Sequence, residues 1–192
     1  MGSEYLSNPL VFLIQIFFGL YTAAVVLRFL FQLLKADFYN PISQFIVKIT
    51  TPVLHPLRKV IPGFMGVDTA SLVLAWALKT VELLLIILLT SGQLTLLMPL
   101  LLAIPSLLEL FINIFLYAVF IQVILSWVAP GGHNPAVQLI YSLTEPVMRP
   151  ARRLIAPIQG IDLSPMLVIV GLYLLKMLLI PPVEALVGTL LR

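Results

Sequence analysis

The chain has 192 residues, of which 61% are hydrophobic and only 10% are charged. Soluble globular chains carry about 25% charged residues and 45–50% apolar ones. With a mean hydropathy of +1.12, the polar residues are too few to cover a water-soluble fold, so the composition indicates an integral membrane protein. The absence of cysteine excludes disulfides, thiolate metal sites and iron–sulfur clusters within the chain. The net charge of +3 is informative only through the positions of the charged residues along the chain.

Two apolar segments predict membrane spans in the first half of the chain. A helix that crosses a hydrocarbon core of about 30 Å needs roughly 20 apolar residues. Residues 9–34 reach this length with Arg28 as their only charge, and residues 69–90 reach it before the dipeptide Ser91-Gly92. We expect the first repeat unit, residues 1–90, to consist of these two spans and the loop 35–68 between them.

Prolines divide the apolar run that follows. Pro99 and Pro105 lie inside it, and helices usually end before a proline. Residues 93–104 are too short to cross a membrane, so we expect an interfacial or re-entrant piece within a connecting segment at 91–105. A third span is expected at 106–128.

A fourth span is expected at 165–180, where Pro165 suits a first helical position and Pro181-Pro182 ends the apolar run. After this break, apolar residues from Val183 to Leu191 keep helical spacing, which predicts an interfacial helix at 182–192. The second repeat unit, residues 106–192, then holds spans three and four around the loop 129–164.

Basic residues predict the orientation, because loops kept in the cytoplasm carry the excess of lysine and arginine. Four lie between spans one and two, three lie between spans three and four, and none lies between residues 90 and 105. We therefore expect both loops on the cytoplasmic side and both termini on the outer side. The loop cations are Lys35, Lys48, Arg58, Lys59, Arg149, Arg152 and Arg153.

The two basic loops are copies of each other. The segment from Asn40 aligns without a gap to the segment from Asn134, at a constant offset of 94 residues. Because both loops lie on the same side, the repeats are parallel, and we expect a pseudo-twofold axis along the membrane normal. The matched pairs are Asn40 and Asn134, Pro41 and Pro135, Pro52 and Pro146, Pro56 and Pro150, Arg58 and Arg152, Lys59 and Arg153, and Asp68 and Asp162.

Apolar residues inside each loop keep helical spacing, which predicts short amphipathic helices. The proline pairs at 52 and 56, and at 146 and 150, are expected to stop one helix and start another. Two interpretations stay open. The helices can lie on the inner leaflet with their cations near anionic headgroups, or they can close over the bundle and form a docking platform for a membrane partner.

Charges inside the spans are costly and call for partners. They are Arg28, Lys79, Glu82, Glu109 and Lys176. Arg28 is expected within reach of Asp68 or Asp162. Because Glu82 and Lys176 are repeat equivalents at equal depth, we expect them to pair, with Lys79 and Glu109 nearby. Pairing that holds helices together is favoured over an ion or proton relay, because no continuous polar stripe follows the first span.

Nothing in the sequence has the pattern of an enzyme site or a cofactor site. Nucleophile elbows, phosphate-binding glycine loops and HExxH helices are absent. His55 and His133 are not repeat equivalents, so we expect no metal or haem. Asp68 and Asp162 fit helix caps better than acid–base groups. We expect no catalytic activity, no cofactor and no nucleic-acid partner.

The doubled pattern of Asn-Pro, a proline-spaced basic loop and Gly-Val/Ile-Asp before the next span resembles the YggT/YlmG family of bacterial and plastid membrane proteins. The resemblance covers nearly the whole chain and implies a bacterial inner-membrane location. Family members are associated with osmotic stress and potassium homeostasis, with cell division and, in plastids, with cytochrome complex maturation. One departure is Pro165, which stands where the first copy has Ser71.

Two functional hypotheses follow. The first is a non-enzymatic assembly or organising factor that binds a membrane partner or anionic lipid through its basic loops. The second is a transporter or channel component in osmotic or potassium homeostasis. The sequence leaves open the partner, any transported species, and whether the chain forms a homo-oligomer.

Overall fold

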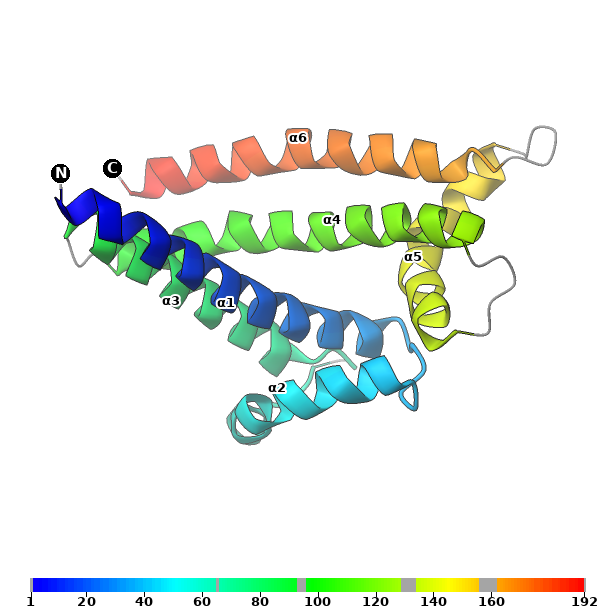
Figure 1. The fold of residues 1–192 in the computed structure, drawn as a ribbon, viewed down its shortest axis with the longest axis horizontal. Helices are drawn as coiled ribbons and strands as arrows, with labels where there is room; N and C mark the ends of the chain where they lie inside the picture. The colour runs from blue at the N-terminus through cyan, green and yellow to red at the C-terminus, as the bar shows by residue number, and fades with distance from the viewer. Residues whose placement is uncertain (1, 65, 93–95, 129–133, 156–161, 192) are drawn as a thin grey trace.

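The computed structural model describes residues 2–64, 66–92, 96–128, 134–155 and 162–191. Within these ranges the regular structure is helical, and Figure 1 shows the six helices in chain order. They are α1 (Gly2–Leu33), α2 (Pro41–Val60), α3 (Thr69–Ser91), α4 (Leu97–Val128), α5 (Pro135–Leu154) and α6 (Ser164–Leu190).

Four of these helices are long and apolar enough to cross a membrane, which confirms the predicted all-α membrane fold with four spans. The candidate spans are Asn8–Leu33, Thr69–Ser91, Leu97–Val128 and Ser164–Leu190. At 1.5 Å per residue, the shortest has 23 residues and extends over about 35 Å, more than a hydrocarbon core of about 30 Å.

The long helices pack as two pairs that meet along one seam. α1 packs against α3, α4 packs against α6, and α3 joins the pairs by packing along α4. A buried apolar cluster connects α1, α3 and α4 with both short helices. Within it the rings of Phe29 and Phe111 meet edge to face with centroids 5.9 Å apart.

The described ends of the chain and the short helices lie at opposite ends of the bundle. Figure 1 shows the start of α1 and the end of α6 at one end, and α2 and α5 at the other. Each short helix packs on the two long helices that flank it in sequence, and α2 also contacts α5. We call this end, formed by α2, α5 and the first turns of α3 and α6, the loop end.

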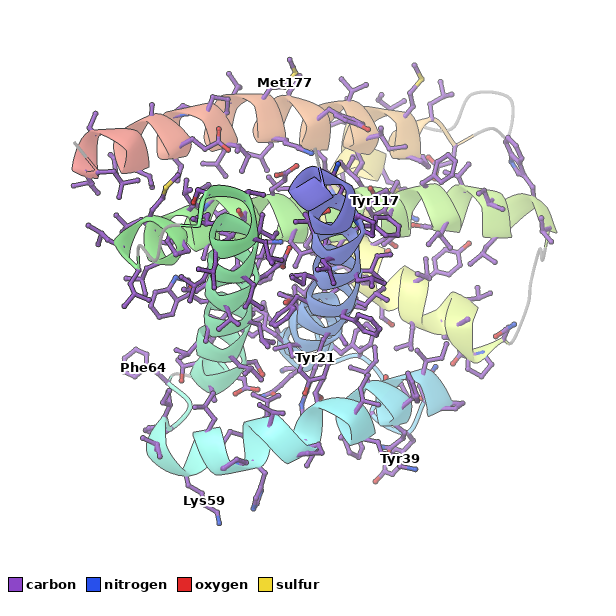
Figure 2. The ribbon with its side chains drawn as sticks, turned by 60° about the vertical axis from the view of Figure 1, so that its left-hand side comes forward. Tyr21, Tyr39, Lys59, Phe64, Tyr117 and Met177 are labelled. Atoms are coloured by element: carbon purple, nitrogen blue, oxygen red, sulfur yellow. The ribbon has the colours of Figure 1, made fainter. Side chains whose placement is uncertain are left out.

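The packing of the long helices does not follow the expected pseudo-twofold symmetry. Repeat symmetry maps the α3–α4 packing onto a packing of α6 along α1. Among the described residues α6 packs on α4 and α5; Figure 1 shows it diverging from α1 toward the loop end, and Figure 2 shows it running along α4. The two repeats therefore share a topology but have different surroundings.

The loop prolines do not break the short helices as expected. α2 runs continuously through Pro52 and Pro56, and α5 runs through its equivalent prolines. Pro52, Pro56 and Lys48 are all exposed and spaced by four residues, so they share one outward face. Each proline leaves the carbonyl four residues before it without an N–H partner, and these carbonyls lie on the outward face. The helix can therefore bend at the prolines rather than end. Figure 1 shows α2 turning near its C-terminal end.

The expected division of residues 93–128 is also wrong, because α4 is one helix of 32 residues. Pro99 lies in its first turn, where backbone N–H groups have no helical partner in any case. Pro105 lies inside the helix and is buried. One lost hydrogen bond costs less than exposing several unpaired backbone groups to an apolar environment, so the helix continues.

The same reasoning applies at the end of the chain. α6 continues through Pro181 and Pro182 to Leu190, so no separate interfacial helix begins at residue 182. Helices tolerate proline in apolar surroundings because ending there would leave more backbone groups unpaired.

Candidate functional site

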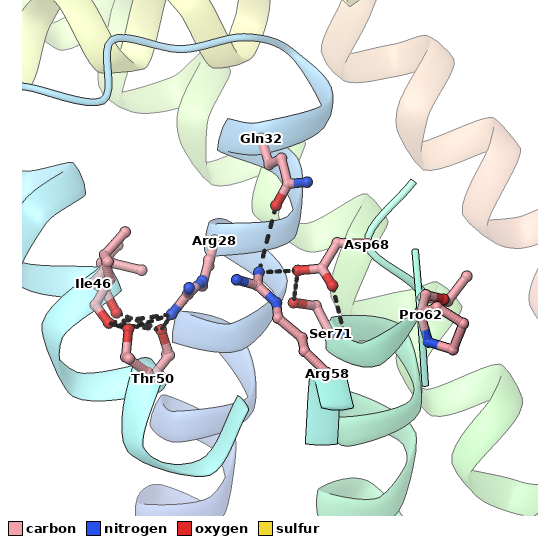
Figure 3. A network of polar contacts seen from close by, with 11 residues as sticks. Arg28, Gln32, Ile46, Thr50, Arg58, Pro62, Asp68 and Ser71 are labelled. Carbon is pink, nitrogen blue, oxygen red and sulfur yellow. Dashed lines mark hydrogen bonds and ion pairs between the residues drawn. The ribbon is translucent and has the colours of Figure 1, made fainter. Parts of the chain in front are cut away.

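The polar residues that the sequence singles out gather mainly at the loop end. There, α2 and α5 cover the ends of the long helices, and Figure 3 shows the network in the first repeat. Pro41 and Pro135 each occupy the first turn of their helix, after an asparagine N-cap. The exposed cations Lys59 and Arg153 lie in the last turns of α2 and α5.

Arg28 fixes α2 to α1. Its Nη1 donates to Thr50 Oγ1 at 2.7 Å, to Thr51 Oγ1 at 2.9 Å and to the Val47 carbonyl at 3.2 Å. Both threonine hydroxyls donate to carbonyls of their own helix, at 2.6 Å from Thr50 to Ile46 and 2.5 Å from Thr51 to Val47. Because each hydroxyl proton is used in this way, the hydroxyl oxygens are held as acceptors for the Arg28 guanidinium. Arg28 as a whole residue is 9% exposed.

Asp68 pairs with Arg58 rather than with Arg28, which corrects the expected partner. Its carboxylate accepts from the Arg58 guanidinium and from the Ser71 hydroxyl at 2.5 Å, and it caps α3 through the Ser71 N–H. The predicted role of Asp68 as a helix cap is confirmed. Figure 3 shows Arg58 also reaching Gln32, at 3.5 Å. Burial raises the pKa of the Asp68 carboxyl, but the hydrogen bonds and charge outweigh it and hold that pKa below its usual value.

The second repeat builds its loop end differently, because Gln122 stands where the first has Arg28. Gln122 is buried and its Oε1 has no partner among the described residues. Arg152 instead bridges Glu145, at 2.9 Å, and Asp162, at 3.5 Å. These three side chains are partly exposed, so the ion pairs lie nearer the surface than the Arg58–Asp68 pair.

Asp162 differs from Asp68 as a cap. It accepts from the Ser164 N–H at 2.9 Å, but the N-cap residue of α6 is Leu163, which makes no side-chain capping bond. Burial raises the pKa of Asp162, whereas hydrogen bonds from Ser164 and the charge of Arg152 lower it, and the net effect is a pKa below the usual value.

Asn40 links the two loop helices. Its Oδ1 accepts from the Ile42 N–H at 3.0 Å, which caps α2, while its Nδ2 donates to the Pro135 carbonyl at 2.7 Å. Asn134 makes the equivalent capping bond to Ala136 at 2.9 Å but remains exposed. Only the first copy of the Asn-Pro motif therefore both caps a helix and bridges the repeats in the described structure.

The intramembrane charges do not form the expected pair between Glu82 and Lys176. Lys79 pairs with Glu82 at 2.9 Å within α3, and Lys176 pairs with Glu109 at 2.7 Å between α6 and α4. The expectation was wrong because it required α3 to face α6, whereas α4 packs against both. Lys176 also donates to Asn113 at 3.1 Å.

Sequence reasoning missed Thr50, Thr51 and Ser43. Thr50 and Ser43 are buried on the face of α2 that meets the bundle. A hydroxyl on the otherwise apolar face of a helix was the available signal, since such a group needs a buried partner. Among the described residues no group of three His, Asp or Glu side chains could hold a metal ion, and His133 lies outside them.

Comparison with known proteins reproduces the repeat. The chain matches the CCB3/YggT family over residues 7–89 and again over residues 101–183, two stretches 94 residues apart. An uncharacterized Pseudomonas aeruginosa protein is 45% identical over 185 residues, covering 95% of this chain and 94% of that protein. No solved structure matches the chain.

Two further relatives are similar over most of their length. A protein encoded in the proC 3′ region of Vibrio alginolyticus is 40% identical and covers 86% of this chain and 90% of its own. The uncharacterized protein YggT of Escherichia coli K12 is 36% identical over 88% of both chains. The doubled match and the relatives' coverage show that the chain is a membrane protein of the CCB3/YggT family.

Proposed function

We propose that this protein is a non-enzymatic organising factor of the bacterial inner membrane, which binds a membrane partner through the cytoplasmic face of α2 and α5. The observation that supports the proposal is that both helices are fixed to the bundle while their cations point outward. Lys48 and Lys59 on α2, and Arg149 and Arg153 on α5, are all exposed. We call these four residues the basic face.

A rigid basic face suits a binding role because little conformational entropy is lost when a partner docks on it. Arg28 and Asn40 hold α2 in place, and Arg58 and Arg152 are engaged in ion pairs. Within the basic face, Arg149 pairs with the partly exposed Glu145 of its own helix, at 3.4 Å, and its side chain stays 67% exposed. The outward cations can therefore contact an acidic surface without loosening the fold. Exposed Phe45 and Val53 on α2 add apolar contact area beside them.

The test separates the basic face from the cations that hold the fold. A variant with Lys48, Lys59, Arg149 and Arg153 all changed to glutamine is expected to fold but to fail in restoring a deletion strain under hyperosmotic stress. The control changes Lys79→Gln and Glu82→Gln, which removes an ion pair from α3 and leaves the face intact. Full rescue by the basic-face variant would overturn the proposal.

A transport component in ion homeostasis is the second candidate, and one feature favours it. A cavity of about 510 Å³ between α4 and α6 is lined by Glu109, Asn113, Lys176 and the tyrosines 117 and 173. Such a group of polar side chains at membrane depth is unusual and functional by default. The measurement is ion flux into liposomes that contain the purified protein. Flux that disappears in Glu109→Gln supports this candidate, and no flux under any gradient removes it.

A further inference from the structure

A small cavity between α1 and α2 at the loop end concentrates positive charge. It has a volume of about 320 Å³ and is lined by Arg28, Lys35 and Arg58 together with Gln32 and Ser43, and none of the described residues that line it is acidic. Ligand pockets range from roughly 300 to 1,000 Å³, so this one suits a compact group. Asp68 neutralises Arg58, which leaves two of the three cations without a carboxylate partner among the residues that line the cavity.

The cavity also contains hydrogen-bond donors that the protein does not use. Ser43 is 3% exposed, and its Oγ has no partner in the described structure. It lies in the first turn of α2, where the helix dipole is positive. The hydrogen bonds that described residues accept from Arg28 all leave from Nη1, so its Nη2 and Nε remain available. Figure 3 shows the Arg28 and Arg58 guanidinium groups at the centre of this region.

Lys35 is held at the cavity in a costly conformation. Its φ is 54°, in the left-handed region that side chains other than glycine rarely adopt. The Ala36 N–H bonds to the Phe31 carbonyl at 2.9 Å and the Lys35 N–H bonds to Gln32 at 3.2 Å, which is the glycine-favouring arrangement that ends many helices. A lysine at this position places a cation at the cavity where a glycine would be easier to accommodate.

The second repeat lacks these features at equivalent positions. Gln122 replaces Arg28, Ala129 replaces Lys35 and Val137 replaces Ser43, so only the third cation, as Arg152, is retained. The duplicated backbone therefore does not require this charge cluster.

We propose that the cavity binds a phosphate group, and specifically the headgroup phosphate of an anionic phospholipid. Two cations without a carboxylate partner among the lining residues, a serine hydroxyl and a helix N-terminus are the donors that recognise phosphate. The lipid is favoured as the source because the rim carries Phe38, which is 56% exposed and stacks edge to face on exposed Tyr39. Exposed aromatic rings of this kind lie at the headgroup level of membranes.

The test measures lipid binding to the full chain by native mass spectrometry. We expect one phosphatidylglycerol to bind in preference to phosphatidylcholine. The variant Lys35→Gly with Ser43→Val is expected to bind phosphatidylglycerol at least about 10-fold more weakly. Valine at residue 43 copies the second repeat. Glycine at residue 35 removes the cation, as the uncharged residue of the second repeat does, and suits the left-handed backbone there. Lys35→Gly alone relieves the left-handed strain but is expected to bind phosphatidylglycerol several-fold more weakly.

The control is Lys48→Gln with Lys59→Gln, which removes two cations from the exposed surface and none from the cavity. It is expected to bind the lipid like the unaltered protein, and it separates this site from the basic face of the proposed function. Equal binding by the cavity variants and the unaltered protein would overturn the proposal. Displacement of the lipid by equimolar inorganic phosphate would assign the site to the free ion and overturn the lipid as its source.

Discussion

The first repeat fixes its loop helix with a buried charge, whereas the second fixes its loop helix with apolar contacts and a surface ion pair. Arg28 joins α1 to α2 through two threonine hydroxyls. At the equivalent position Gln122 makes no such connection, and Met148 and Ala151 of α5 instead pack with Val119 and Val168 in an apolar cluster. One backbone plan therefore accommodates two ways of closing the loop end.

The difference also changes the space under each loop helix. The first repeat encloses the basic cavity of about 320 Å³, while the second has a cavity of about 750 Å³ bordered by Phe120, Trp127 and Tyr141. The wider cavity is lined mainly by apolar side chains, and Arg152 and Asp162 at its edge pair with each other. The first repeat thus gathers cations around the space under its loop helix, whereas the second leaves a larger and more apolar space there.

Removing the buried anchor should have the largest effect. Arg28→Leu deletes three hydrogen bonds from a charged donor and is expected to lower the free energy of unfolding by about 3 kcal/mol, since such bonds contribute roughly 1.5–3 kcal/mol each and part is regained by burying leucine. Unfolding in mixed micelles measures the change, and trypsin should cut faster at Lys48 as α2 loosens. Unchanged unfolding and unchanged cleavage would show that Arg28 does not anchor α2.

Replacing the equivalent aspartates Asp68 and Asp162 compares the stability of the ion pairs in the two repeats. Asp68→Asn is expected to cost about 2 kcal/mol, because it leaves Arg58 without its buried partner. Asp162→Asn is expected to cost less than about 1 kcal/mol, because Asp162 and Arg152 are partly exposed and surface pairs contribute little. Equal costs for the two substitutions would mean that burial does not distinguish the repeats.

The pH dependence provides an independent check of the same pair. The pKa of Asp68 is lower in the folded protein than its reference value of 3.8, so its stabilisation is present above that pH. It is lost as the pH falls through the lowered folded pKa. The unaltered protein should therefore lose more stability below pH 3.8 than Asp68→Asn does. The same loss in both would assign the acid sensitivity to other carboxyl groups.

Sequence alone predicted the four spans and their duplication but not the pairing of the charges. The four spans, the repeat offset and the cap at Asp68 follow from local patterns that short stretches of chain determine. The pairing of Glu82 depended on which helices become neighbours, and repeat symmetry suggested the wrong neighbour. The prolines at 105, 181 and 182 misled for a related reason, because rules from soluble helices underestimate the cost of ending a helix in apolar surroundings.

Each repeat carries its own intramembrane ion pair, and double-mutant cycles can test this. We expect a coupling of about 1 kcal/mol between Lys79 and Glu82, and a similar value between Glu109 and Lys176, because both pairs are in contact. The coupling between Glu82 and Lys176 should be near zero. A large coupling between that last pair would restore the symmetric arrangement that the structure contradicts.

The smallest expected effect is a gain in stability at Gln122. Its buried Oε1 has no partner in the described structure, and an unpaired buried polar group costs roughly 1–3 kcal/mol. Gln122→Leu removes that group and places apolar atoms beside the large cavity, so we expect the free energy of unfolding to rise by about 0.5–1 kcal/mol in detergent. The same change in Arg28 is expected to be strongly destabilising, so the pair of leucine variants compares the repeats at equivalent positions. A loss of stability on Gln122→Leu would mean that the amide has a partner in the membrane, and the large cavity would then be where that partner binds.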